Sequence, residues 1–224
     1  GIIIGSVFVS GLGLKFTQSV IDLSGGVLFI LLCLTAVSAI ILGMGMTTTA
    51  VYITVAALIV PSLIESGIMP IAAHMFAFYF GVVSTITPPV ALASFAGAAI
   101  AKSPPMATAV ESSKVGIAKY IVPFAFVYNP SLLMEGPIIW SIYSLISVLL
   151  AYWSMTLGLE GWFNGKLNVF KRTLAILSSV TLLVPPLQYI YGIDGIYFNF
   201  LGIFILMVIY YLQGKLNFNM KVTT

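Results

Sequence analysis

Two polar interruptions inside long apolar stretches constrain this chain more than any other feature of its sequence. They cover residues 43–49 and 84–89, with the sequences Gly43-Met44-Gly45-Met46-Thr47-Thr48-Thr49 and Ser84-Thr85-Ile86-Thr87-Pro88-Pro89. Hydrocarbon cannot hydrogen-bond free backbone groups, so irregular backbone at membrane depth survives only where it is buried in protein or faces a polar cavity. A pair of interrupted apolar segments therefore indicates a substrate or ion site in a secondary transporter.

The composition places the chain in a lipid bilayer. Hydrophobic residues make up 60% of the 224 residues and charged residues 7%, whereas a soluble domain carries roughly 25% charged residues. The nine basic and six acidic residues are thinly spread, so no basic patch indicates nucleic acid. The basic excess is better explained by cytoplasmic loops. Cys33 is the only cysteine, which excludes an internal disulfide.

The apolar stretches predict a series of helices, because a spanning helix needs about 20 apolar residues. Residues 1–5 open inside an apolar run. They are expected to end a cut helix whose first half, with more of the protein, lies upstream. Residues 14–25 are too polar to span, and an interfacial helix is predicted there. Residues 26–64 enclose the first interruption and are predicted to form a hairpin.

The second interruption separates residues 71–83 from residues 90–101. Each piece is too short to span alone, so residues 71–101 are predicted to form one broken helix. Ser103, with Pro104 in the first turn, is predicted to cap a surface helix. Four spans are predicted beyond it, at residues 121–133, 138–157, 173–191 and 196–212.

The charges predict an orientation. The loop before the third of these spans and the segment after the last carry the cations Lys166, Lys171, Arg172, Lys215 and Lys221. The loop between those two spans carries Asp194 and no cation, so both basic ends are expected in the cytoplasm. Counting back places Glu135 outside and Lys102 inside.

The two interruptions can be arranged in two ways. Either the first is the tip of a re-entrant hairpin and the second interrupts a crossing helix, or the reverse. Both arrangements leave Lys102 inside, and they differ on the side of Glu65. We favour the first arrangement because it places Glu65 and Asp22 together outside, with no basic residue near Glu65.

The interruptions concentrate oxygen atoms without carboxylates. The predicted ligand residues supply six hydroxyls, namely those of Thr47, Thr48, Thr49, Ser84, Thr85 and Thr87. Gly43 and Gly45 permit backbone conformations that turn carbonyls outward, and Pro88 removes an N–H donor and frees an upstream carbonyl. Such ligands suit Na⁺, whereas Ca²⁺ or Mg²⁺ would normally need Asp or Glu. Helix N-termini after each interruption favour a substrate anion, while the alternative reading is a pair of packing kinks.

No motif predicts an enzyme. His74 is the only histidine and is interpreted as a packed or interfacial side chain. The sequence has no zinc-type HExxH, no GxSxG and no P-loop. Neither a catalytic residue nor a metal other than Na⁺ is predicted.

Several segments resemble the large membrane subunit of TRAP transporters, and the fused permease of the TAXI-type branch is the best match. They lie at residues 43–52, 78–81, 87–91 and 123–130, and read GMGMTTTAVY, FYFG, TPPVA and PFAFVYNP. The resemblance covers about residues 1–133 and is weak beyond Gly136. One departure is Thr47, where the family often has proline.

The resemblance implies a tripartite, Na⁺-driven uptake system in the cytoplasmic membrane of a bacterium or archaeon. A periplasmic binding protein would deliver an organic acid, and a small membrane subunit, separate or fused upstream, would accompany the permease. On this pattern residues 1–135 form the second of two inverted repeats of an elevator-type transporter. Its hairpin tip would be at residues 43–49 and its broken helix at residues 84–89, while residues 136–224 would add further transmembrane helices.

Three alternatives stay open. A proton-coupled carrier is disfavoured because no Asp, Glu or His lies within either interruption, and an intramembrane proton relay would normally need one. A membrane enzyme would need a paired nucleophile and base. A structural membrane subunit without a site of its own would tolerate loss of the hydroxyls.

Overall fold

The computed structural model describes the backbone of residues 5–6, 9–163, 165–190 and 192–222, and the side chains of these ranges except at residues 12, 14, 189–190 and 214–222. The predicted cut helix at residues 1–5 lies outside them apart from Gly5. The chain forms two compact units, Gly1–Leu133 and Met134–Thr224.

The predicted all-α membrane fold is confirmed. The strands in the described part are the two-residue β1 (Tyr189–Ile190) and β2 (Ile193–Asp194), which pair antiparallel with Tyr189 opposite Asp194. Two helical segments, Ile138–Glu160 and Gly195–Gln213, are long and apolar enough to cross a membrane. Shorter apolar helices flank the two interruptions in the first unit.

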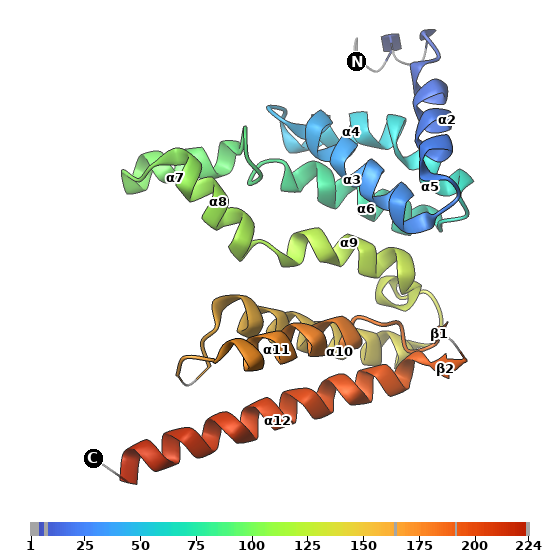
Figure 1. Cartoon of the computed structure of the whole chain (residues 1–224). Coiled ribbons are helices and arrows are strands. Elements are labelled where there is room, and N and C mark those ends of the chain that lie inside the picture. The colour runs from blue at the N-terminus through green and yellow to red at the C-terminus, as the bar shows by residue number, and fades with distance from the viewer. Residues whose placement is uncertain (1–4, 7–8, 164, 191, 223–224) are drawn as a thin grey trace. The chain divides into compact units, whose positions relative to one another are not determined.

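The first unit consists of short helices (Figure 1). They are α2 (Leu12–Ser24), α3 (Leu28–Gly43), α4 (Thr48–Leu58), α5 (Val60–Glu65), α6 (Pro70–Val83), α7 (Leu92–Ala101), α8 (Pro105–Val115) and α9 (Ala118–Tyr128), followed by the 3₁₀ turn η1 (Pro130–Leu133). Their core lies where α3, α4, α5 and α6 pack together, with α9 against α6. Phe76 at its centre is fully buried, and its ring lies 4.8 Å from that of Phe80 and 5.4 Å from that of Phe124.

The hairpin prediction for residues 26–64 is correct for the first arm and needs a correction for the second. The arm after the interruption is not one helix, because α4 ends at Leu58 and α5 begins at Val60. The cause is Pro61, which lacks an N–H and whose ring clashes with the carbonyl four residues earlier. A left-handed Gly67 at φ 86° then follows α5.

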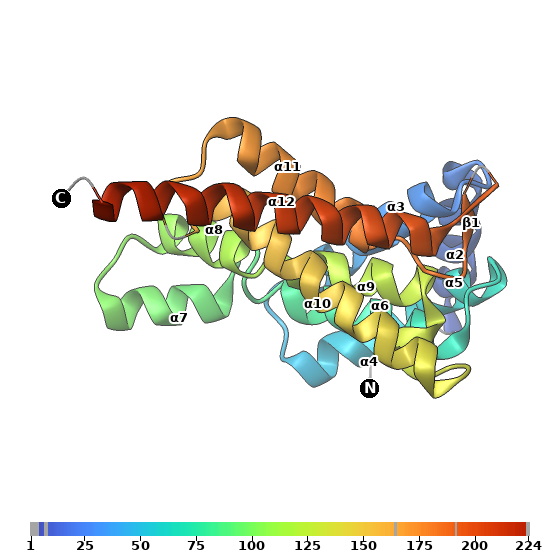
Figure 2. The same ribbon diagram turned by 90° about the horizontal axis from the view of Figure 1, so that it is seen from below.

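The predicted surface helix is present, but its cap is not Ser103. The N-cap of α8 is Pro104, and the Ser103 hydroxyl lies 2.8 Å from the Thr108 hydroxyl instead. Helices α7 and α8 lie next to each other (Figure 2). The predicted span at residues 121–133 is also divided, because α9 ends at Tyr128 before Asn129 and Pro130.

The second unit packs α10 (Ile138–Glu160), α11 (Val169–Leu182) and α12 (Gly195–Val222) around small residues. The face of α10 toward α11 carries a repeating series of buried small residues: Ser141, Ser144, Ser147, Ala151, Ser154 and Gly158. The Ser147 hydroxyl donates to the Leu182 carbonyl at 2.8 Å, and the Ser154 hydroxyl donates to the Ala175 carbonyl at 2.7 Å. Small residues with short polar side chains allow membrane helices to approach closely and to hydrogen-bond one another.

The predicted span at residues 173–191 is wrong in both limits. Helix α11 covers 14 residues from Val169 to Leu182, about 21 Å in length, which is too short to cross a bilayer. It ends early because Pro185 and Pro186 have no N–H to donate to the Thr181 and Leu182 carbonyls.

The side-chain amide of Asn199 on α12 replaces the missing donors. Its Nδ2 lies 3.1 Å from the Thr181 carbonyl, 3.3 Å from that of Leu182 and 3.0 Å from that of Val184. The end of α11 is therefore closed by a side chain from the neighbouring helix, which we call the asparagine cap.

Candidate functional site

The first interruption is a short turn between α3 and α4 that exposes three threonines. Helix α3 ends at Gly43, and Gly45 adopts a left-handed backbone with φ 78°. Thr47 is the N-cap of α4, and its carbonyl accepts from the Val51 N–H at 2.9 Å. The side chains of Thr47, Thr48 and Thr49 are all exposed, and within the described part of the chain their hydroxyls make no hydrogen bond. These oxygens are free to contact a ligand.

The hydroxyls of the second interruption are engaged with helix carbonyls. Ser84 donates to the Gly81 carbonyl at 2.6 Å, Thr85 to that of Val82 at 2.8 Å, and Thr87 to that of Val83 at 2.7 Å. Such bonds let serine and threonine satisfy carbonyls at the end of a helix. Each donating oxygen keeps lone pairs, so it can still accept a proton or bind a cation.

The segment beyond these hydroxyls folds back on itself before α7 begins. The Ala91 N–H donates to the Thr87 carbonyl at 3.2 Å, and the Ala93 N–H donates to the Thr85 carbonyl at 3.0 Å. Pro88 and Pro89 are joined by a cis peptide bond. Ala91, fully buried, has φ 29°. The break predicted at residues 84–89 therefore extends to Ala91.

The two interruptions meet in the folded first unit. A Cβ atom built on Gly43 would lie 2.6 Å from the Ser84 hydroxyl and 2.9 Å from the Gly81 carbonyl oxygen. A Cβ built on Gly81 would lie 2.6 Å from Cγ1 of Val51 on α4. The end of α3, the start of α4 and the end of α6 thus touch with no room for a further atom. We call this contact, formed by Gly43, Val51, Gly81 and Ser84, the glycine joint.

Two residues that the sequence analysis missed contact the second interruption. The Tyr120 hydroxyl of α9 lies 2.6 Å from the Thr87 hydroxyl, and the Ser113 hydroxyl of α8 donates to the Ile86 carbonyl at 3.0 Å. A groove of about 300 Å³ is lined by Pro88, Val110, Ser113, Lys114, Ile117 and Tyr120. The sequence contained no signal for these contacts, because Thr87 and Tyr120 are 33 residues apart and belong to no common motif.

A third missed residue is Ser94 in the first turn of α7. It is 95% buried, being 5% exposed, and its hydroxyl has no hydrogen-bond partner among the described residues. Ala91, the N-cap before it, offers no side-chain oxygen to α7. The first turn of a helix carries unpaired N–H groups and a partial positive charge.

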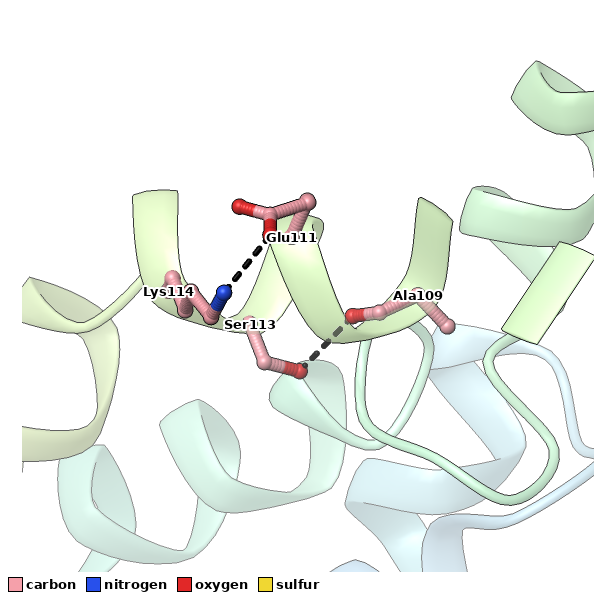
Figure 3. A network of polar contacts seen from close by, with 4 residues as sticks. All are labelled: Ala109, Glu111, Ser113 and Lys114. Carbon is pink, nitrogen blue, oxygen red and sulfur yellow. Dashed lines mark hydrogen bonds and ion pairs between the residues drawn. The ribbon is translucent and has the colours of Figure 1, made fainter. Parts of the chain in front are cut away.

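Charged groups stand apart from the two interruptions in the described structure. The nearest to the groove is Lys114, whose Nζ lies 2.6 Å from Oε1 of Glu111 on α8, with both side chains well exposed (Figure 3). An exposed pair of this kind contributes about 0–1 kcal/mol. Within the described residues, no cluster of three His, Cys, Asp or Glu side chains could hold a metal ion. Neutral oxygens dominate the site.

His74 has a partner that the sequence did not reveal. Its Nδ1 lies 3.0 Å from the Tyr52 hydroxyl, which joins α6 to α4, and the Tyr52 ring meets that of Phe78 edge-on at 5.8 Å. The contact ties together the two helices on either side of the glycine joint.

An all-α chain with two interrupted apolar segments in contact is a membrane transporter component. The chain matches the family model of the tripartite ATP-independent periplasmic transporter, DctM component, over residues 1–140, and it belongs to that family. It is thus a large permease component of a TRAP transporter, as the resemblance predicted. Neither curated proteins nor solved structures gave a match to the chain.

Proposed function

We propose that this chain takes part in Na⁺-coupled uptake of an organic acid across the cytoplasmic membrane of a bacterium or archaeon. A periplasmic binding protein delivers the acid, and a small membrane subunit assembles with the permease. We further propose that the chain is the C-terminal portion of a TAXI-type fused permease. Residues 1–135 are its second inverted repeat, which moves as an elevator, and residues 136–224 are additional membrane helices.

The observation that carries this proposal is the glycine joint. It brings the turn with three free hydroxyls, those of Thr47, Thr48 and Thr49, against the break that holds Ser84. We assign the cation to oxygens of the two interruptions, because neutral oxygens suit a hard monovalent ion and the described residues there include no carboxylate. The acid's carboxylate is assigned to the first turns of α4 and α7, where helix N-termini attract anions.

One observation favours the alternative of a structural subunit. The hydroxyls of Ser84, Thr85 and Thr87 all bond back to α6 carbonyls, as they would in a packing kink without a ligand. A proton-coupled carrier receives no such support. The experiments below separate the structural reading from the proposed symport.

The first experiment measures uptake by the assembled transporter in proteoliposomes. We expect uptake to require Na⁺ and to need no proton gradient. Uptake that persists unchanged when choline replaces Na⁺ would contradict the proposed coupling.

The second experiment changes one oxygen. Thr49→Val keeps the side-chain shape and removes the hydroxyl, and leaving a desolvated partner unpaired costs about 1–3 kcal/mol. We therefore expect the Na⁺ concentration for half-maximal uptake to rise by roughly fivefold to a hundredfold. Thr54→Val on the same helix and Thr173→Val on α11 are matched controls, because both hydroxyls already bond to local carbonyls. Equal half-saturation in all variants would leave the first interruption a packing feature.

A further inference from the structure

The contact between Thr87 and Tyr120 has a defined direction. Thr87 Oγ1 lies 2.7 Å from the Val83 carbonyl and 2.6 Å from the Tyr120 hydroxyl. A carbonyl only accepts, so the single Thr87 proton is donated to Val83, and Tyr120 must donate its own proton to Thr87. One lone pair of the Thr87 oxygen is then used by Tyr120, and the other stays available to a ligand.

A second contact fixes the residue before Thr87. The Ser113 hydroxyl lies 3.0 Å from the Ile86 carbonyl and also 3.0 Å from the Ala109 carbonyl, the contact drawn in Figure 3. A Cβ built on Gly116 would lie 2.7 Å from Cδ1 of Ile86, so the Ile86 side chain rests directly on the α8 backbone. The Ile86-Thr87 segment is therefore held by groups that come from α8 and α9.

Hydrogen bonds, and not packing alone, fix the Tyr120 side chain. One part of Tyr120 packs against the core of the first unit, while another lines the open groove beside Pro88 and Ser113. The groove leaves room for the ring to shift if its bond to Thr87 is lost. Loss of the hydroxyl should thus change the position of Thr87 without unfolding the helix.

We propose that Tyr120 and Ser113 are positioning residues of the second interruption. They hold Ile86 and Thr87 so that the remaining lone pair of the Thr87 oxygen faces the coupling cation. This inference rests on the proposed Na⁺-coupled uptake and extends it to two residues outside both interruptions. Tyr120 acts through Thr87 and does not itself contact the cation.

The test measures the Na⁺ dependence of uptake by the assembled transporter carrying Tyr120→Phe. We expect half-saturation to rise by roughly twofold to tenfold, the equivalent of one ordinary hydrogen bond, with a smaller change in maximal rate. Ser113→Ala should shift half-saturation in the same direction. Thr87→Ser should keep the value of the unaltered chain, because the hydroxyl is retained. Tyr143→Phe on α10 is the matched control, since the Tyr143 hydroxyl has no partner among the described residues.

The double variant Tyr120→Phe with Thr87→Val identifies the pathway. If Tyr120 acts through Thr87, the double variant should have the half-saturation of Thr87→Val alone, because both changes break the same bond. Effects that multiply, or a Tyr120→Phe variant with normal half-saturation and a lower melting temperature, would overturn the inference and leave the proposed function intact. Uptake by the unaltered chain that ignores Na⁺ would overturn both.

Discussion

At the scale of single residues, the two glycines of the first interruption have different roles. Gly45 has φ 78°, a conformation in which side chains other than glycine are strained. Gly43 ends α3 without a positive φ, and what it provides is the absence of a Cβ beside Ser84 and Gly81. The sequence predicted backbone freedom for both residues. Only the fold could reveal the close contact at Gly43, because its partners are 38 and 41 positions away along the chain.

We predict that Gly43→Ala impairs the transporter strongly. The added methyl would meet a carbonyl oxygen at 2.9 Å as well as the Ser84 hydroxyl, and overpacking of this kind destabilises by about 1–3 kcal/mol. Melting temperature and uptake rate in proteoliposomes should both fall. Gly97→Ala on α7 is the control, because a Cβ there meets nothing within 4 Å. Equal behaviour of the two variants would show that α3 and α6 can separate at no cost.

At the scale of elements, the asparagine cap shows how a membrane helix can end at two prolines. The sequence placed Pro185 and Pro186 near the end of a span but did not predict that α11 would stop at Leu182. The donor that closes the end, Asn199, comes from the first turns of α12. A single sequence does not show which distant amide faces a free carbonyl.

We predict that Asn199→Leu lowers the stability of the second unit. It leaves the carbonyls of Thr181 and Leu182 without the amide donor, at a cost of about 1–3 kcal/mol, or nearer 0.6 kcal/mol if the lipid-embedded state finds other partners. Ser144→Ala is the control, because the Ser144 hydroxyl is buried with no partner among the described residues. Thermal unfolding in detergent compares the two. Greater loss from Ser144→Ala would contradict the role of the cap.

The placement of the hairpin predicts the sides of two exposed charges. If α3 to α5 form the re-entrant hairpin and α6–α7 the broken crossing helix, Glu65 lies in the periplasm and Lys102 in the cytoplasm. Single cysteines at these positions, in a background without Cys33, should be labelled from opposite sides of the membrane by an impermeant reagent. Labelling of both from one side would refute this arrangement, and Glu65 alone changes side if the roles of the interruptions are reversed.

At the scale of the whole molecule, the family match and the division of the chain agree closely. The family model covers residues 1–140 and the first compact unit ends at Leu133. The sequence could predict this because its motifs all lie before residue 131, and because composition and apolar patterning identify membrane helices without tertiary information. It could not predict the contacts of Tyr120 and Ser113, which depend on how α8 and α9 return to residues 86–87.

We predict that the segment between the two units tolerates an insertion. Met134, Glu135 and Gly136 are all exposed, and Met134 and Gly136 have positive φ values, as in an irregular connection. Exposed loops of this kind accept added residues. Four glycine or serine residues inserted after Glu135 should leave the half-saturation by Na⁺ unchanged, whereas the same insertion after Thr87 should abolish uptake. Loss of uptake from both insertions would show that the site depends on how the units are connected.

The glycine joint also has a mechanical consequence. Gly43 rests on Gly81 and Ser84, and Gly81 rests on Val51, so a turn between two helices is wedged directly onto a third. Swinging the tip of the hairpin away like a hinged gate would open a void between backbones already in contact, and closely packed interiors resist this. We therefore expect a displacement of α6 to carry α3 and α4 with it as one rigid body. The ligand would then travel with these helices, since they leave no lid that could lift away from it.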